Sequence, residues 1–312
     1  MHLSDHVLKC FLALVETRQF TLAAEACHMS QSALSQLIAR LEERVGVLLF
    51  HREPRSVTPT AEGLRLAETA RRVNAEIEHA VADLREAATL RTGHVSMAVV
   101  PSLAVTWLPG ILRVYLGRYP GVGLQLYDHS SERTHELVRQ GLVHFGLNSQ
   151  PGSPTEVDAE LLFDEVLYVV CPPDHPLAGR KEVTARALRG VKFLHIQGSG
   201  MMLVRTSAGL RPARQVLQEA GIVETGFDVN NLATLSGLVA AGLGVCLAPE
   251  RSLPQFSLLP TVAVRISARL MTRPIYFIQR KHRHLNPAAA TLRELLFELR
   301  DSGGSGAQKA AR

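Results

Sequence analysis

The stretch FTLAAEACHMSQSALSQLIARLEERVGVLLFHREPRSVTPTAEG, residues 20–63, decides the fold of the N-terminal part of the chain. Residues 20–26 predict a short apolar helix, and the three residues after it predict a tight break. Ser30 stands at the N-cap of a second helix, where its hydroxyl can accept a hydrogen bond from a free backbone amide. Two short helices joined in this way are typical of a helix-turn-helix, although an ordinary surface hairpin of helices gives a similar pattern.

The second helix has two chemically different faces. Its apolar face consists of Ala33, Leu34, Leu37, Ile38 and Leu41. Its polar face carries side chains that can reach base edges or phosphates, namely Gln31, Ser32, Ser35, Gln36 and Arg40. We add Thr21, in the preceding helix, to this predicted DNA-binding set.

A short basic loop follows the second helix. His51, Arg52 and Arg55 surround Pro54, and residues 56–58 favour an extended exit from the loop. A basic loop beside a recognition helix is a wing, which is suited to phosphate or minor-groove contact. A plain helical hairpin needs no such loop, so the segment favours a winged helix-turn-helix and adds Arg52 and Arg55 to the DNA-binding set.

The run SQSALSQLIARLEERVGVLLFHREPRSVTPTAEG, residues 30–63, is similar to the N-terminal signature of the LysR-type transcriptional regulators. The likeness is close over about the first sixty residues, and the chain length and later organisation also fit. Pro59-Thr60 stands where the family usually has Leu-Thr, and proline is acceptable in the first turn of a helix.

This resemblance implies a bacterial, cytoplasmic transcription regulator that is not an enzyme and needs no cofactor or metal. It implies binding to double-stranded promoter or operator DNA and to a small-molecule effector, assembly as a homotetramer (a dimer of dimers), and no membrane partner. It also allows for contact with RNA polymerase.

Residues 61–90 predict one long linker helix. Leu66, Ala70, Val73, Ile77, Ala80, Leu84 and Ala87 recur at alternating steps of four and three residues. Such a heptad seam favours pairing with a helix of a second chain, and the alternative is a helix that lies on the core of its own domain. About thirty residues of helix span ~45 Å.

From residue 91 the chain alternates between strand and helix patterns, which predicts an α/β domain with a parallel-rich sheet. Residues 102–119 predict one helix, and another is expected near residues 209–220. The order of elements resembles the two-lobed type 2 periplasmic-binding-protein architecture of LysR-type effector domains. We therefore expect a DNA-binding domain at 1–60, a linker at 61–90, an effector domain at 91–300 and a disordered tail at 301–312. Lobe I is expected at about 91–163 and 268–300, and lobe II at about 164–267.

Polar residues follow several of the predicted strands. In open α/β sheets, ligands bind beyond the carboxyl ends of strands. Each such residue alone is compatible with a simple cap or turn. Together they resemble the segments that line the inducer cleft in this family, which implies an effector site formed by Ser102, Ser130, Asn148, Ser199 and Asn230.

The net charge of +5 is unevenly distributed. Residues 1–60 contain six basic and six acidic side chains, whereas residues 91–312 contain 24 basic and 17 acidic ones. The basic excess therefore lies in the C-terminal part, as a solvated surface or as a preference for an anionic effector. The expected effector is a small organic anion.

The remaining signals are weaker. Cys10, Cys27, Cys171 and Cys246 follow no zinc or redox motif, which favours reduced thiols and leaves a redox sensor using Cys171 and Cys246 as an alternative. His282 and His284 are expected at the surface, as are Arg205 and Arg211, and Gly242–Gly244 predicts a turn. A binding protein or enzyme with a helical N-terminal extension is a further alternative, but no hydrolase or nucleotide-binding motif supports it.

Overall fold

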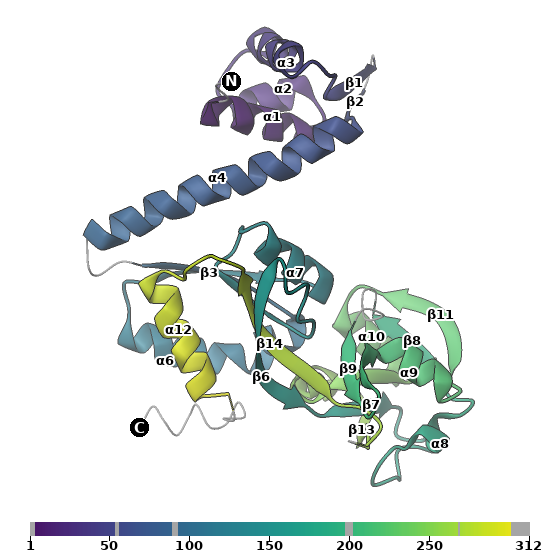
Figure 1. The fold of residues 1–312 in the computed structure, drawn as a ribbon. Coiled ribbons are helices and arrows are strands. Elements are labelled where there is room, and N and C mark those ends of the chain that lie inside the picture. Colours follow the sequence, from purple (N-terminus) through teal and green to yellow (C-terminus); the bar gives the residue numbers. More distant parts are fainter. Residues whose placement is uncertain (1–3, 54–55, 89–92, 197–201, 268, 301–312) are drawn as a thin grey trace. The chain divides into compact units, whose positions relative to one another are not determined.

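The computed structural model describes residues 4–53, 56–88, 93–196, 202–267 and 269–300. The predicted tail at 301–312 lies outside the described residues. The chain forms two compact units, residues 1–88 with 140–142, and residues 89–139 with 143–312. We call the first unit the head and the second the body, and describe each by itself (Figure 1).

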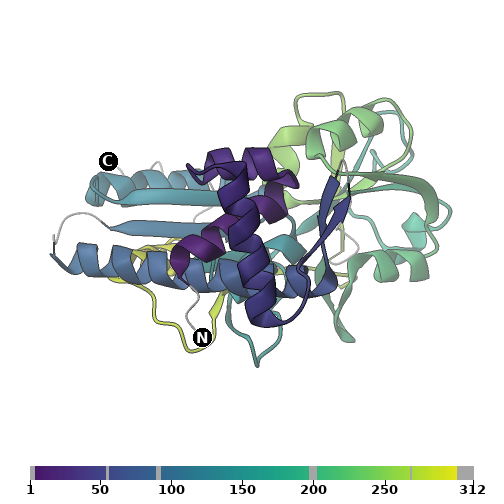
Figure 2. The same cartoon turned by 90° about the horizontal axis from the view of Figure 1, so that it is seen from above.

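Three short helices that lie across one another form the core of the head (Figures 1 and 2). They are α1 (Asp5–Thr17), α2 (Phe20–Ala26) and α3 (Gln31–Val45). His28 takes a left-handed conformation in the turn between α2 and α3, with φ of 54°. Ser30 Oγ accepts a hydrogen bond from the amide of Ala33 at 3.2 Å, so the predicted N-cap of α3 is confirmed.

A two-stranded antiparallel hairpin follows, formed by β1 (Phe50–Glu53) and β2 (Ser56–Pro59). The buried carboxylate of Glu42 accepts hydrogen bonds from the amides of Leu49 and Phe50, at 2.9 and 3.1 Å. Glu42 therefore ties the end of α3 to the start of the wing, because a buried carboxylate is stable only where it is hydrogen-bonded.

Pro59 does not lie in the first turn of a helix, as the sequence predicted. Pro59 is the last residue of β2 and pairs with Phe50, the first residue of β1. It therefore lies at the open end of the hairpin, where a residue without an N–H interrupts no further strand pairing. The next helix begins after Thr60, whose Oγ1 donates to Leu48 O and accepts from the amide of Gly63. A Cβ at Gly63 would lie 2.2 Å from Leu49 O, so only glycine allows this close approach.

The long helix α4 (Ala61–Ala88) runs without a break in both views (Figures 1 and 2). Ala67 and Ala70 are buried in the core of the head, with Leu66 and Val73 packed beside them. Ile77, further along the predicted seam, is 46% exposed. The first half of the seam therefore lies on the core of its own domain, which was the alternative to pairing with a second chain.

Lobe I of the body is built on a five-stranded sheet of order β4-β3-β5-β14-β6. The strands are β3 (His94–Val99), β4 (Gly123–Asp128), β5 (Phe145–Asn148), β6 (Val157–Glu165) and β14 (Arg273–Arg280). Strands β4, β3 and β5 are parallel, whereas β14 is antiparallel to both β5 and β6. The parallel-rich prediction therefore holds for one half of this sheet only.

Four helices belong to lobe I: α5 (Pro101–Thr106), α6 (Leu108–Arg118), α7 (Ser131–Arg139) and α12 (Pro287–Glu298). The single helix predicted over 102–119 is broken at Trp107. Pro109 explains the break, because a proline inside a continuous helix would lack its N–H and clash with the preceding turn. At the start of a new helix the same proline is well placed.

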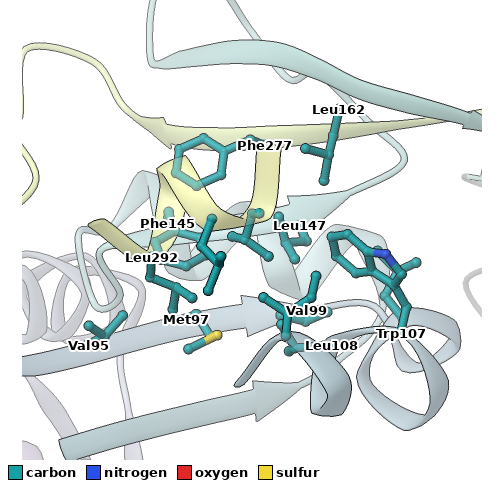
Figure 3. Packing of buried hydrophobic residues seen from close by; sticks show 14 of the residues in the cluster. Val95, Met97, Val99, Trp107, Leu108, Phe145, Leu147, Leu162, Phe277 and Leu292 are labelled. Atoms are coloured by element: carbon teal, nitrogen blue, oxygen red, sulfur yellow. The ribbon is translucent and has the colours of Figure 1, made fainter. Parts of the chain in front are cut away.

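Aromatic and aliphatic side chains fill the core of lobe I (Figure 3). Phe145 from β5 stacks on Phe277 from β14 with ring centroids 4.7 Å apart. Trp107 meets Phe163 edge to face at 5.3 Å. The first contact packs β14 against the parallel strand β5, and the second packs the end of β6 against the junction of α5 and α6.

Lobe II contains small sheets with short helices. Its strands are β7 (Leu167–Cys171), β8 (Lys192–Ile196), β9 (Leu203–Thr206), β10 (Gly209–Pro212), β11 (Val223–Val229), β12 (Cys246–Pro249) and β13 (Val262–Arg265). Its helices are α8 (Ala185–Leu188), α9 (Ala213–Glu219), α10 (Leu232–Ala240), η2 (Glu250–Ser252) and α11 (Leu253–Phe256). β8 and β11 are parallel, while β7 lies between antiparallel β12 and β13. The helix predicted near 209–220 begins only at Ala213, because Gly209 turns the chain into the β9–β10 hairpin with φ of 99°.

The chain passes between the lobes twice. It leaves lobe I after Glu165, at the end of β6, and returns to it at Arg273, at the start of β14. Glu165 and Arg273 are partners in the β6–β14 register. The two crossing segments therefore lie side by side, and each contributes a charged residue at the crossing.

Candidate functional site

The polar face of α3 is exposed as the sequence predicted. Gln31, Ser32, Gln36 and Arg40 are exposed, Ser35 is half-buried, and Leu34, Ile38 and Leu41 point into the core. Thr21 on α2 is also exposed. Ser32 Oγ lies 3.0 Å from Ser30 Oγ, so part of its hydrogen-bonding capacity is used within the helix start.

The structure describes less of the two wing arginines. Arg52 lies in β1, and its side chain is outside the described residues. Arg55 lies outside the described residues altogether.

The body contains a cavity of about 200 Å³ with walls from both lobes. Three of the five predicted effector residues line it: Ser102, Ser130 and Asn230. They come from the ends of three separate strands, as the strand-end rule requires. Ser199, the fourth, lies outside the described residues.

Asn148, the fifth predicted residue, does not line the cavity. It is fully buried, and its side-chain amide donates to Ser131 O at 2.9 Å. Ser131 starts α7 and lines the cavity itself, and its hydroxyl lies 2.9 Å from Ser149 Oγ. Asn148 therefore stands behind the cavity wall and positions the segment that carries Ser131.

Arg273 is a cavity residue that sequence reasoning missed. Its side chain is buried, with 4% exposure for the residue. Its Nη1 donates to Ser102 Oγ at 2.8 Å and to Glu165 Oε2 at 3.2 Å. Nε is buried without a hydrogen-bond partner, and no hydrogen bond among the described residues uses Nη2.

The charge of Arg273 persists in this environment. Burial lowers the pKa of the guanidinium, and the nearby Glu165 carboxylate opposes that effect. An arginine starts from so high a pKa that it stays protonated at neutral pH. The cavity wall therefore contains a buried cation whose Nε and Nη2 edge is free of partners in the described part of the chain.

Glu165 balances only part of the charge around it. Its carboxylate is fully buried and accepts from the amide of Arg251 at 3.0 Å. The Arg251 guanidinium lies 3.6 Å from the same carboxylate and 4.0 Å over the ring of Phe163. Two arginines share one carboxylate, so the group of Arg251, Arg273 and Glu165 carries a formal charge of +1.

His195 and Arg214 line the cavity from lobe II. His195 is 7% exposed, and burial lowers its pKa although Glu224 acts in the opposite direction, so the imidazole is neutral at pH 7. Its Nε2 lies 2.8 Å from Glu224 Oε2, but the angle is too poor for a hydrogen bond. Arg214 holds Glu224 through Nε and Nη2, at 3.1 and 2.9 Å, and reaches Asp228 at 3.5 Å.

No sequence motif marks Arg273, Glu165 or His195. The residues of the ion pair are separated by 108 positions and meet only through strand register. The one signal in the sequence was the basic excess of the C-terminal part, which allowed an anionic ligand without pointing to any residue.

The other weak sequence signals have ordinary structural explanations. Gly242 takes a left-handed conformation just after α10, which fits the predicted turn. Arg205 pairs with Asp164 at 3.2 Å, and Arg211 forms an ion pair with Glu219. Within the described ranges no cluster of His, Cys, Asp or Glu could hold a metal ion.

None of the helices described in the structure is long and apolar enough to cross a membrane.

A head with a helix-turn-helix and a wing, joined to a two-lobed body with a ligand-sized cavity, defines a ligand-responsive DNA-binding regulator. Residues 6–64 match the family described as "Bacterial regulatory helix-turn-helix protein, lysR family", and residues 88–300 match the "LysR substrate binding domain". The chain belongs to the LysR family, and it is a DNA-binding transcriptional regulator with an effector-binding domain rather than an enzyme.

Individual relatives agree with this assignment. The Hca operon transcriptional activator HcaR of Escherichia coli (strain K12) is 34% identical over 244 residues, covering 78% of this chain and 80% of that protein. A probable hydrogen peroxide-inducible genes activator of Streptomyces viridosporus is also 34% identical over 244 residues, covering 78% and 76%. The crystal structure of full-length CbnR complexed with its target DNA shares the fold, with a TM-score of 0.68, 22% identity and coverage of 95% and 99%. The predicted fold class and family are confirmed, and so is the predicted function as an effector-responsive DNA-binding transcriptional regulator.

Proposed function

We propose that the effector of this regulator is a small organic anion bound in the cavity between the lobes. The observation that carries the proposal is the buried guanidinium of Arg273, which lines the cavity and whose Nη2 takes part in no hydrogen bond among the described residues. A guanidinium N–H forms a strong, charge-assisted hydrogen bond to a carboxylate oxygen. Ser102 and Ser130, on the same cavity wall, supply hydroxyls for the remaining carboxylate lone pairs.

The charge balance supports an anion over a neutral ligand. The group of Arg251, Arg273 and Glu165 has one positive charge in excess, and these side chains are mostly buried. A buried charge is stable only where it is paired or hydrogen-bonded. A carboxylate in the cavity would neutralise the excess and satisfy the free donors at once.

A direct test is binding of small organic acids to the full-length chain, measured by thermal shift and calorimetry. We expect Arg273→Lys, which keeps the charge but loses the planar guanidinium and its Nη2 donor, to weaken acid binding by about tenfold or more. Ser102→Ala removes only one hydroxyl and is expected to weaken binding less. Arg205→Lys is the matched control, because Arg205 pairs with Asp164 on an exposed surface. Equal acid affinity in the Arg273→Lys variant and the control would refute the proposal.

For the head, we propose that α3 binds operator DNA in the major groove through Gln31, Ser32, Ser35, Gln36 and Arg40. Thr21 on α2 and the wing residues Arg52 and Arg55 contact the sugar-phosphate backbone of the DNA. The exposure of the described side chains of α2 and α3 supports this assignment. CbnR, which shares this fold, has been crystallised in complex with its target DNA.

We also propose that the chain is cytoplasmic and assembles as a dimer of dimers that can contact RNA polymerase. The proposed DNA-binding domain, linker helix and effector domain comprise residues 1–60, 61–90 and 91–300. The exposed Ile77 and Val81 on α4 support pairing of this helix with a second copy. Sedimentation of an Ile77→Glu, Val81→Glu variant tests this pairing, since dissociation is expected only if the second half of the helix forms the interface.

Peroxide sensing, suggested by the names of some relatives, finds no support in the thiols of the body. Cys171 and Cys246 are buried in the neighbouring strands β7 and β12. Burial raises the pKa of Cys171 to about 11 and also raises that of Cys246. A reactive cysteine needs a stabilised thiolate and access to solvent, and neither residue has them.

A further inference from the structure

We propose that lobe II carries a second DNA-binding surface, which contacts the phosphate backbone of the DNA that flanks the operator. The surface consists of seven exposed basic side chains, which we call the lobe II basic patch: Arg180, Lys181, Arg186, Arg189, Lys192, Arg265 and Arg269. The proposal concerns DNA contact by the body, and it is independent of the effector and of the proposed anion site in the cavity.

The patch surrounds the short helix α8, which lies at the outer edge of lobe II (Figure 1). Five of the seven side chains belong to residues 180–192, where Glu182 is the only acidic residue. The amide of Val183 donates to Arg265 O at 2.8 Å, and the amide of Ser267 donates to Val183 O at 2.9 Å. These two hydrogen bonds bring the end of β13 and the turn after it beside the segment that carries the other five cations.

The cations of the patch have no counter-charge within the protein. No ion pair or side-chain hydrogen bond among the described residues uses any of the seven. The other described arginines of lobe II all pair with carboxylates: Arg205 with Asp164, Arg211 with Glu219, Arg214 with Glu224, and Arg251 with Glu165. The unpaired arginine and lysine side chains that the structure describes in lobe II are therefore gathered on one surface. Charges of a single sign gathered in this way produce a potential that attracts a polyanion.

The chemistry of the patch favours DNA over an acidic protein as the partner. Protein interfaces bury a core that is rich in aromatic and apolar side chains and poor in lysine. Among residues 172–192 no large hydrophobic side chain is exposed. Contacts to DNA phosphates need only basic or hydrogen-bonding groups, which is what the patch offers. DNA is also the polyanion that a protein with this helix-turn-helix domain binds.

The charge of the head explains why contacts outside it are needed. Residues 1–60 contain six basic and six acidic side chains, so the head brings no excess of cations to the phosphates. Residues 91–312 hold 24 basic side chains, and seven of these form the patch. Double-stranded DNA carries one negative charge per about 1.7 Å of its axis, so a surface of this kind can contact several phosphates at once.

The test is operator binding by the full-length chain as a function of salt concentration. The probe is an operator selected from random sequence and placed between long flanks of unrelated sequence. The Arg186→Gln, Arg189→Gln double variant removes two exposed cations of the patch, which lie about one helical turn apart around α8. We expect the affinity to fall by about tenfold at ~0.1 M salt. The slope of the logarithm of the association constant against the logarithm of the salt concentration should become shallower by about two.

Two further features of the expected result identify a contact with flanking phosphates. The loss of affinity should be the same with flanks of any sequence, because phosphate contacts do not read bases. It should disappear when the flanks are removed from the probe.

Two ion-paired arginines of lobe II provide the matched control. The Arg205→Gln, Arg211→Gln double variant changes the net charge by the same amount, but both of its cations are already paired with carboxylates. We expect this variant to keep the salt dependence of the unmodified chain. Thermal melting of both variants checks that they are folded, and since the replaced side chains of the patch are exposed, we expect an unchanged midpoint for the test variant.

Three outcomes would overturn the proposal. Equal affinity and equal salt dependence in the two double variants would show that the patch is only a solvated surface. Normal operator binding with loss of transcriptional regulation in the patch variant alone would assign the patch to an acidic protein instead of DNA. A loss of affinity that persists on the operator without flanks would show that the patch does not contact flanking DNA.

Discussion

The proposed DNA-reading side chains of the head and the charged pair beside the cavity of the body lie in opposite environments. On α3, Gln31, Gln36 and Arg40 are exposed, and the apolar face behind them carries the fold. In the body, Arg273 and Glu165 line or support the cavity while they are buried in the structure itself. We therefore expect the head to lose one of these side chains with little loss of stability, whereas loss of Glu165 should destabilise the body.

The largest expected effect is loss of the buried carboxylate. Glu165→Ala leaves Arg273 and Arg251 without their shared partner, so the free energy of unfolding of the body should fall by about 3–5 kcal/mol. Fluorescence of Trp107, the only tryptophan of the chain, reports this unfolding, because the indole packs against Phe163 in lobe I.

Asp164 provides the matched control for this experiment. It is the neighbouring residue, but its ion pair with Arg205 is exposed, with side-chain exposures of 43% for Arg205 and 40% for Asp164. Asp164→Ala should cost less than about 1 kcal/mol. Similar losses in the two variants would remove the contrast between buried and exposed charges.

The next largest effect concerns DNA affinity. Gln31→Ala or Gln36→Ala should weaken binding to operator DNA, selected from random sequence by the full-length chain, by about 5- to 100-fold. The free energy of unfolding should change by less than about 0.5 kcal/mol, because both side chains are exposed.

Ser4→Ala should show the reverse behaviour. Ser4 caps α1 by accepting a hydrogen bond from the amide of Val7, so its loss should cost about 0.5–1 kcal/mol of stability with little change in operator affinity. Unchanged affinity in both glutamine variants would show that α3 is not the recognition helix.

A smaller effect is expected from acid. Burial is the main cause that lowers the pKa of His135, His175 and His195, all in the body. As the pH falls below about 6.5, these histidines bind protons in the unfolded chain before they do so in the folded chain. Their contribution to the free energy of unfolding is therefore complete above that pH and is lost below it. Denaturation followed by Trp107 fluorescence should give a lower midpoint at about pH 5.5 than at pH 7.5. His195→Asn should reduce the difference, and an unchanged or larger difference in that variant would contradict the role of His195.

The smallest expected effect is that of peroxide. Treatment of the full-length chain should produce no disulfide between Cys171 and Cys246 and no change in operator affinity, because both thiols are buried and protonated. Mass spectrometry of the treated protein checks this, and a bridge between the two cysteines would revive the redox alternative.

The difference between the two regions also explains what the sequence could predict. The head is encoded locally. Ser30 caps the helix that begins at the next residue, through the amide of Ala33, and the wing follows that helix, so one contiguous stretch predicts the whole motif. The prediction put Pro59 in the first turn of a helix, because the end of β2 and the start of α4 lie only two residues apart.

The cavity was predicted only in part. Ser102, Ser130 and Asn230 come within three residues of the ends of β3, β4 and β11, and all three line the cavity, whereas their role in binding an effector stays a prediction. Arg273 and Glu165 meet through the pairing of distant strands, and His195 depends on the packing of lobe II, so no local pattern marks them.

The position of Arg273 on a crossing strand has a consequence for the evolution and engineering of such regulators. The proposed anion-binding residue Arg273 belongs to the connection between the lobes, while lobe II supplies much of the apolar wall of the cavity. If the proposal holds, substitutions in that apolar wall should change which acid is bound and leave Arg273 in place. A biosensor library built on this chain should vary the positions of Leu194, Leu217 and Leu235 and keep Arg273 and Glu165 fixed.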